Sequence, residues 1–219
     1  MGCGEGHVAA ELTLRGYRLT GVDADPESVV QAQERGVHAV SASWPEFDSP
    51  PLDAVVFTRS LHHISPLDQV VDRAGELLRP MGYLLIEDFA FDEANEPTIA
   101  WLLKVLRSPQ ATALIDPTAG GFAADLLGSN NPVEAWHHNH DHDLHTIAQM
   151  QRAIAARFAI SETHSVPYLY RYLVPMLAKS AEAASFVDQV FREEMRLGAQ
   201  GKLVLIGRRL VASHFAAKQ

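Results

Sequence analysis

The sequence contains very little cysteine: one residue, Cys3, in a chain of 219. A single cysteine cannot form a disulfide within the chain, and this scarcity is typical of proteins in a reducing compartment. Nothing in the sequence marks Cys3 as an activated thiol. We therefore interpret Cys3 as part of a loop and not as a nucleophile.

Long apolar runs are also missing from the sequence. No stretch approaches the roughly 20 apolar residues that a helix needs to cross a bilayer. The first residues do not form a charged and then apolar signal sequence. We therefore expect a soluble, cytoplasmic protein with no membrane partner.

Basic residues are outnumbered, with 18 Lys and Arg against 27 Asp and Glu and a net charge of −9. This charge opposes attraction to phosphate backbones, so we expect no nucleic-acid partner. Apolar residues make up 47% and charged residues 21% of the chain, as in an ordinary globular protein with a core. A small-molecule partner fits this composition, and a homodimer is left open.

The order of the expected elements predicts an α/β fold. The chain has the length of one domain, so we treat residues 1–219 as a single domain. Short β-branched runs alternate with helical patterns, which is typical of a doubly wound, mostly parallel sheet wrapped by helices. We expect strands at residues 19–22, 37–41, 53–57, 83–86, 159–164 and 202–207. We also expect a helical cover at about 92–156 and, between the last strands, an insertion at about 168–201 with a helix at about 181–197.

Two helices in the first half of the chain have clear start signals. Asp25 can cap a helix that begins at Pro26 and stops at Gly36. Ser65 can cap a second helix that begins at Pro66. The apolar residues of the second helix form one stripe, so we expect it to lie on the sheet.

The chain opens on a glycine loop, Gly2-Cys3-Gly4-Glu5-Gly6. Glycines let a backbone approach a ligand closely, and the N–H groups of a following helix attract its polar end. A strand then ends at Asp23, where a carboxylate can accept both hydroxyls of a ribose. Loop and acid together predict a site for an adenosine-containing ligand. A nicotinamide cofactor is disfavoured, because its G-x-G-x-x-G loop has the third glycine one residue later.

These residues resemble those of the class I S-adenosylmethionine-dependent methyltransferases of the small-molecule type. That family carries a G-x-G-x-G loop, a V-D pair, an L-H-H segment and an L-R-P-G-G turn. The matching residues here fall within about the first 90 positions: Gly2 to Gly6, Val22-Asp23, Leu61-His62-His63 and Leu78-Arg79-Pro80-Met81-Gly82. The resemblance implies a Rossmann-like fold, S-adenosyl-L-methionine as cofactor and methyl transfer to the O, N or C atom of a small-molecule acceptor.

The same resemblance implies which residues bind the cofactor. They are the loop and strand-end residues Gly2, Cys3, Gly4, Asp23, Ala24, Ser41, Ala42, Thr58 and Arg59. Asp23 would hold the ribose. Where the family often has an Asp-Ala pair that reaches the adenine, this chain has Ser41-Ala42. Trp44 either packs on the adenine rim or closes the sheet edge as a core aromatic.

One departure from the family concerns the strand that should precede the loop. Only Met1 precedes Gly2 here. In the doubly wound order this strand lies between those ending at Asp23 and Thr58, so its loss would leave two inner edges unpaired or force them together. We therefore hypothesise an N-terminal truncation, with the natural chain beginning upstream. The alternative function is a noncatalytic methyltransferase-fold protein that binds a partner.

His62 and His63 are the candidate catalytic residues. They follow the strand ending at Thr58, at the sheet edge where such folds bind ligands. A base is needed only if the acceptor must lose a proton, and local packing is the alternative role. A second run of histidines, at residues 137–145, suits transition metals. It lacks an H-E-x-x-H pattern, so we expect no metal and interpret it as a polar lid.

Overall fold

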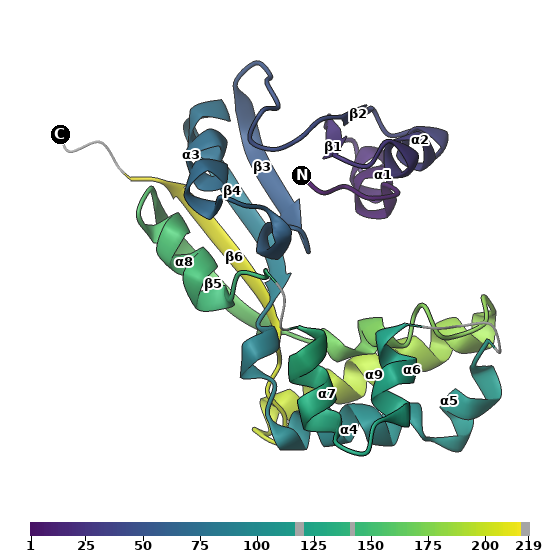
Figure 1. Ribbon diagram of the computed structural model, residues 1–219. Helices are drawn as coiled ribbons and strands as arrows, with labels where there is room; N and C mark the ends of the chain where they lie inside the picture. Colours follow the sequence, from purple (N-terminus) through teal and green to yellow (C-terminus); the bar gives the residue numbers. More distant parts are fainter. Residues whose placement is uncertain (117–120, 141–142, 216–219) are drawn as a thin grey trace. The chain divides into compact units, whose positions relative to one another are not determined.

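The computed structural model describes residues 1–116, 121–140 and 143–215. It divides into two compact units. The first comprises Met1–Asp88, His145–His164 and Arg208–Gln219, and the second comprises Phe89–Leu144 and Ser165–Gly207. Helices and strands alternate through the first unit, whereas the second is mainly helical (Figure 1). The single domain expected over residues 1–219 stays a prediction.

The strands form two sheets. A two-stranded sheet pairs β1 (Gly21–Asp23) in parallel with β2 (Ala39–Ser41). The other sheet has the order β3 (Leu52–Thr58), β4 (Leu78–Phe89), β6 (Gly207–His214) and β5 (Phe158–Val166). β3 and β4 run parallel, with Val55 opposite Leu84. The parallel pairs and their connecting helices confirm the predicted Rossmann-like fold class (Figure 1).

The inner edges of the two sheets are not joined by a ladder. Among the residues that the structure describes, β1 pairs with β2 and β3 pairs with β4, but β1 and β3 do not pair with each other. The Cys3 N–H donates to the carbonyl of Val22 over 3.1 Å. The Met1 amino group donates to the carbonyl of Val56 over 2.5 Å. Residues 1–3 therefore contact both inner edges through single hydrogen bonds.

Helices surround the strands of the first unit. They are α1 (His7–Leu14), α2 (Pro26–Glu34), α3 (Leu67–Leu77) and α8 (Ile147–Ala155). Asp25 caps α2 as predicted, because its carboxylate accepts the N–H groups of Glu27 and Ser28. The predicted apolar stripe of α3 is buried. Helix α8 packs on α3, although it falls within the range predicted for the helical cover.

The cap predicted at Ser65 does not form. Pro66 has an extended backbone, with ψ of 133°, and α3 begins one residue later than predicted, at Leu67. Ser65 is therefore too far from the first turn to accept its N–H groups. Its hydroxyl instead lies 3.0 Å from Nε2 of His145. The prediction was wrong because a Ser-Pro pair does not show whether the serine or the proline is the last residue before the helix.

The second unit consists of helices around a hydrophobic core that includes several aromatic residues. The helices are η2 (Phe91–Glu93), α4 (Glu96–Leu106), α5 (Pro109–Leu114), α6 (Phe122–Gly128), α7 (Pro132–Asn139), η3 (Leu169–Tyr172) and α9 (Ala181–Ala199). Trp136 is fully buried and donates its indole N–H to the carbonyl of Phe91 over 2.9 Å.

No helix in the described part of the chain is long and apolar enough to span a membrane.

Glu194 of α9 is a fully buried carboxylate in this unit. It accepts hydrogen bonds from the backbone N–H groups of Tyr168 over 2.7 Å, Leu169 over 3.0 Å and Tyr170 over 3.1 Å. Burial raises the pKa of Glu194, while these three bonds act in the opposite direction. A buried carboxylate requires such donors. Glu194 therefore holds the start of η3 in place.

The strand predicted at residues 202–207 is wrong, because β6 begins only at Gly207. The apolar run belongs instead to the core of the second unit. Val204 donates its N–H to the Thr98 hydroxyl over 2.9 Å, and Ile206 is fully buried. In the true strand, buried Arg208 precedes exposed Arg209. Two adjacent arginines interrupt the alternation of apolar and polar residues on which strand prediction depends.

Candidate functional site

The glycine loop turns sharply before α1. Gly2, Gly4 and Gly6 have φ angles of 63°, 50° and 79°, a region that glycine adopts most readily. A Cβ on Gly6 would lie 2.7 Å from Cβ of Ala32, whereas a Cβ on Gly4 would meet no atom within 4 Å. Gly6 is therefore required for packing against α2. Gly4 faces open space, where a ligand can approach the backbone.

Asp23, at the end of β1, is joined to this loop. Its Oδ2 accepts the Gly4 N–H over 2.7 Å, and its Oδ1 accepts the Asp25 N–H over 3.1 Å. A carboxylate has about four acceptor positions, so it can also accept ligand hydroxyls. The carbonyl of Asp23 accepts the Ala42 N–H over 2.9 Å, which joins the ends of β1 and β2. The loop and the acid predicted to form a site thus lie together.

The carboxyl end of β3 reaches the same loop through Ser60. A Cβ on Gly2 would lie only 2.3 Å from Cβ of Ser60. The Ser60 hydroxyl donates to the carbonyl of Met1 over 2.8 Å. Arg59 has an unusual positive φ of 57° and donates its N–H to the carbonyl of Glu87 over 2.6 Å. Sequence reasoning missed Ser60, because only the folded loop brings it to Gly2.

The residues predicted to bind the cofactor are set at the carboxyl ends of β1, β2 and β3 and in the glycine loop. Those that are half-buried are Gly2, Cys3, Gly4, Asp23, Ala42 and Thr58. Those that are exposed are Ala24, Ser41 and Arg59. Their predicted roles toward a ligand stay predictions. Their placement at strand ends is that of ligand-binding residues in open α/β sheets.

Cys3 does not have the surroundings of a reactive thiol. Burial raises its pKa, and the nearby charge of Asp23 raises it further. A thiol with a raised pKa is mostly protonated at neutral pH and is a poor nucleophile. This supports the interpretation of Cys3 as a loop residue.

Trp44 lies in the connection between β2 and β3 and is 7% exposed. Its indole N–H donates to the carbonyl of Val70 over 3.0 Å, and its ring packs edge-on against Phe57 at 5.4 Å. These contacts favour the core alternative over packing on an adenine.

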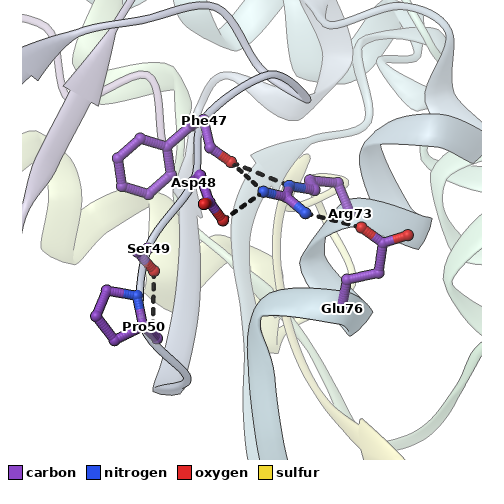
Figure 2. Close-up of polar contacts among 6 residues, drawn as sticks. All are labelled: Phe47, Asp48, Ser49, Pro50, Arg73 and Glu76. Atoms are coloured by element: carbon purple, nitrogen blue, oxygen red, sulfur yellow. Dashed lines mark hydrogen bonds and ion pairs between the residues drawn. The ribbon is translucent and has the colours of Figure 1, made fainter.

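The same connection is held on α3 by Arg73 (Figure 2). The Arg73 guanidinium donates to the carbonyl of Phe47 from Nε over 3.0 Å and from Nη2 over 2.8 Å. It also pairs with Asp48 at 2.9 Å and with Glu76 at 2.8 Å. Arg73 thereby anchors the segment that leads from β2 to β3.

The candidate catalytic histidines lie in η1 (Leu61–His63), directly after β3. His62 is buried and His63 is exposed, with their ring centroids 4.0 Å apart. Nδ1 of His62 lies 2.6 Å from Oδ1 of Asp88, although its N–H is not aimed along that line. The His62 backbone N–H donates to Oδ2 of Asp88 over 3.3 Å. Asp88 was not among the predicted site residues.

The histidine run at residues 137–145 is divided between the two units, and residues 141–142 lie outside the described part. His140 has Nδ1 2.7 Å from the carbonyl of Trp136 and Nε2 3.3 Å from the hydroxyl of Tyr172. Across residues 1–116, 121–140 and 143–215, no three His, Cys, Asp or Glu side chains are grouped to hold a metal ion. The lid role stays a prediction.

Comparison with known proteins shows which proteins this chain resembles. Residues 1–86 match the methyltransferase domain family. An uncharacterized methyltransferase of Mycobacterium tuberculosis is 34% identical over 95 residues, which cover 41% of this chain and 48% of that protein. The chain thus spans about half the length of that curated relative. A ubiquinone biosynthesis O-methyltransferase of Paracidovorax citrulli is 25% identical over 196 residues, covering 84% of this chain and 76% of that protein.

A solved structure shows the same fold over nearly the whole chain. Geranyl diphosphate C-methyltransferase from Streptomyces coelicolor, solved with Mg²⁺, geranyl diphosphate and S-adenosyl-L-homocysteine, has a TM-score of 0.56. It is 12% identical and covers 98% of this chain and 70% of that chain. At this identity the likeness is one of fold. This chain is therefore similar to methyltransferases in sequence over residues 1–86 and in fold over nearly its whole length.

Proposed function

We propose that this chain transfers a methyl group from S-adenosylmethionine to a small-molecule acceptor. The observation that carries the proposal is the 2.7 Å hydrogen bond between Gly4 and Asp23, which joins the glycine loop to the acid. When bound, the cofactor supplies an electrophilic methyl group on a sulfonium. The protein contributes mainly binding and alignment, because an in-line displacement depends on orientation.

The binding roles in this proposal follow from position and chemistry. Asp23 has acceptor positions left for the ribose hydroxyls, and Gly4 leaves space for the ligand beside the loop. The other proposed binding residues are Gly2, Cys3, Ala24, Ser41, Ala42, Thr58 and Arg59. The donor set fits a nucleoside, since it combines a carboxylate with a glycine loop before a helix.

His62 and His63 are the proposed bases for an acceptor that must lose a proton. Both lie in η1, after the strand that ends at Thr58. His62 is placed against Asp88, whereas His63 is exposed. The name of the Paracidovorax citrulli relative supports a small-molecule acceptor. The attacked atom, O, N or C, is left open.

The second candidate is a noncatalytic methyltransferase-fold protein that binds a partner. The observation that favours it is the lack of pairing between β1 and β3 among the described residues. The glycine loop then depends on the two-stranded sheet and on single hydrogen bonds for its position. Catalytic groups must be held within about 0.5 Å of their working geometry, which such support provides less well than a continuous sheet.

Calorimetry with S-adenosylmethionine, S-adenosylhomocysteine and NAD, followed by a turnover assay, separates these candidates. The assay measures S-adenosylhomocysteine formed with a panel of small hydroxyl, amine and carbon acids. Binding of S-adenosylmethionine with turnover supports the enzyme, and binding without turnover supports the noncatalytic protein. Binding of neither S-adenosyl compound contradicts the proposed function, and binding of NAD alone indicates an oxidoreductase.

The remaining expectations from the sequence are also proposals. They are a cytoplasmic location, one domain over residues 1–219, the absence of a nucleic-acid partner and a homodimer as an open possibility. The net charge of −9 supports the absence of nucleic-acid binding. Light scattering after size exclusion measures the oligomeric state. A filter-binding assay with DNA and RNA tests the partner.

A further inference from the structure

We propose that the outer edge of β5 (Phe158–Val166) is a self-association surface, on which a second copy of this chain pairs its own β5 in the antiparallel direction. The two strands are centred on Thr163, so a two-fold axis passes between them. Each sheet then continues into the other across this axis. No residue of β5 belongs to the proposed methyl-transfer site, so the test requires no turnover.

β5 is an edge strand of nine residues. In the described part of the chain it is the last strand of its sheet, and no strand pairs with it on the side away from β6. The Ser161 hydroxyl donates to the carbonyl of Val211 in β6 over 3.1 Å, which adds a side-chain contact between the two strands. An edge strand presents a row of N–H and C=O groups that can pair with another chain. The outer edge of β5 therefore has backbone groups available for a further strand.

Both faces of β5 are accessible near its centre. Every side chain from Ser161 to Ser165 is exposed. Because alternate residues of a strand point to opposite faces, this run leaves both faces uncovered. The strand contains neither proline nor glycine, and Ile160, Thr163 and Val166 are β-branched. A second strand can therefore approach this edge and meet a regular backbone.

The sequence of β5 is self-complementary about Thr163. In an antiparallel pair, residues at equal distances on either side of the centre lie opposite one another. Thr163 then faces Thr163 of the second copy, and pairs of threonines are favourable across strands. Ser161 faces Ser165 of the second copy. In the same way Ile160 faces Val166, so each of these residues meets a partner of its own chemistry.

Glu162 and His164 select this register over its neighbours. When the pair is centred on Thr163, Glu162 of each copy faces His164 of the other, so a carboxylate meets an imidazole that can donate to it. The two side chains already lie 3.0 Å apart within one chain, from Oε2 of Glu162 to Nε2 of His164. Centring the pair on Glu162 or on His164 would instead bring two carboxylates or two imidazoles together, and like charges directly opposite are destabilising.

Sedimentation equilibrium of the full chain measures the association. We expect the average molar mass to rise from that of one chain toward that of two as the protein concentration increases to about 1 mM, a range that includes weak interfaces. His164→Glu places a carboxylate opposite Glu162 of the second copy and should raise the Kd of the dimer at least about tenfold.

Two further variants test whether the effect of His164→Glu comes from the cross-strand pairs. The double variant with Glu162→His and His164→Glu places unlike groups opposite each other again, so its dimer Kd should return to that of the unchanged protein. His38→Glu is the matched control, because His38 is exposed and precedes β2. It makes the same chemical change away from β5 and should leave the dimer Kd unchanged.

Amide hydrogen exchange, measured by NMR, locates the surface. Alternate N–H groups of β5 point away from β6, and only these gain a partner when a second β5 pairs with the edge. Within residues 160–166 they should exchange more slowly in concentrated than in dilute protein, and His164→Glu should remove the difference. A chain that stays monomeric at about 1 mM overturns the inference. A dimer whose β5 amides exchange as in the monomer, or whose Kd is unchanged in His164→Glu, overturns it as well.

Discussion

Gly4 and Asp23, nineteen residues apart in the sequence, are joined by a 2.7 Å hydrogen bond from a backbone N–H to a carboxylate. Asp23→Asn keeps the shape of the side chain but removes its charge, and hydrogen bonds to charged groups are about twice as strong as neutral ones. We expect the Kd for S-adenosylmethionine, measured by calorimetry, to rise by about 10–100-fold.

Asp25→Asn is the matched control for this substitution. Asp25 is exposed and caps α2, and asparagine caps a helix about as well as aspartate. Its Kd should equal that of the unchanged protein. If Asp23→Asn and Asp25→Asn have the same Kd for S-adenosylmethionine, Asp23 is not part of the proposed site.

Alanine substitutions at Gly4 and Gly6 separate ligand approach from packing. At Gly4 the new Cβ meets no atom within 4 Å, so the cost is the positive φ alone, about 1–2 kcal/mol. Gly4→Ala should keep the fold and weaken cofactor binding at least about tenfold. At Gly6 the Cβ would lie 2.7 Å from Ala32, which adds about 1–3 kcal/mol of overpacking. Urea unfolding measures the stability of the two variants, and calorimetry measures their cofactor binding. A Gly4→Ala variant less stable than Gly6→Ala would contradict the prediction.

Trp44→Phe tests whether Trp44 belongs to the core or to the adenine site. The change removes the hydrogen bond to the carbonyl of Val70, which spans 3.0 Å in a buried position. We expect the free energy of unfolding to fall by about 1–3 kcal/mol. The Kd for S-adenosylmethionine should be unchanged. A folded variant with weakened cofactor binding would favour the adenine alternative.

Glu194→Ala should destabilise the second unit strongly. It leaves the N–H groups of Tyr168, Leu169 and Tyr170 without their acceptor. Each buried polar group that loses its partner costs about 1–3 kcal/mol, so a loss of about 3 kcal/mol or more is expected in urea unfolding. Glu193→Ala is the control, because Glu193 forms a surface ion pair with Arg196. That change should cost less than about 1 kcal/mol.

The raised pKa of Glu194 also predicts a pH dependence of stability. Burial raises this pKa above its ordinary value of 4.5, so the folded chain holds the proton more tightly than the unfolded chain. The stability from that proton is fully present below the ordinary value and is lost as the pH rises through the raised one. Glu194→Gln cannot titrate. The difference in unfolding free energy between the unchanged protein and Glu194→Gln should therefore change between the ordinary and the raised pKa of Glu194. It should level off above the raised pKa.

Short-range signals predicted the local structure well. Asp25 and Pro26 marked the start of α2 because a cap acts over two or three residues. β3 was expected at 53–57 and is observed at Leu52–Thr58, since its apolar run is bounded by polar residues. The strand at 202–207 failed because its apolar residues are equally suited to a helical core. Only tertiary packing decides between these two environments.

The part of the candidate site that depends on short-range order along the chain was predicted, and the part that depends on tertiary packing was not. The glycine loop and Asp23 flank one helix, so their meeting follows from local order along the chain. The pairing of His62 with Asp88 depends on the register of β3 against β4. Sequence placed both residues at strand ends but did not indicate which acid would face which histidine. A contact of this kind is set by the sheet and not by spacing.

The unpaired inner edges have a consequence for how ligand binding and folding are linked. β1 and β2 are three residues long each, and residues 1–3 connect them to β3 through one hydrogen bond from Cys3 to Val22 and one from Met1 to Val56. Segments with so few ladder bonds open locally at a lower free energy than the global unfolding, and their amide hydrogens exchange faster. A molecule that binds the closed loop stabilises it by mass action. The amide hydrogens of β1 and β2 should therefore exchange more slowly as more of the glycine loop is occupied by ligand.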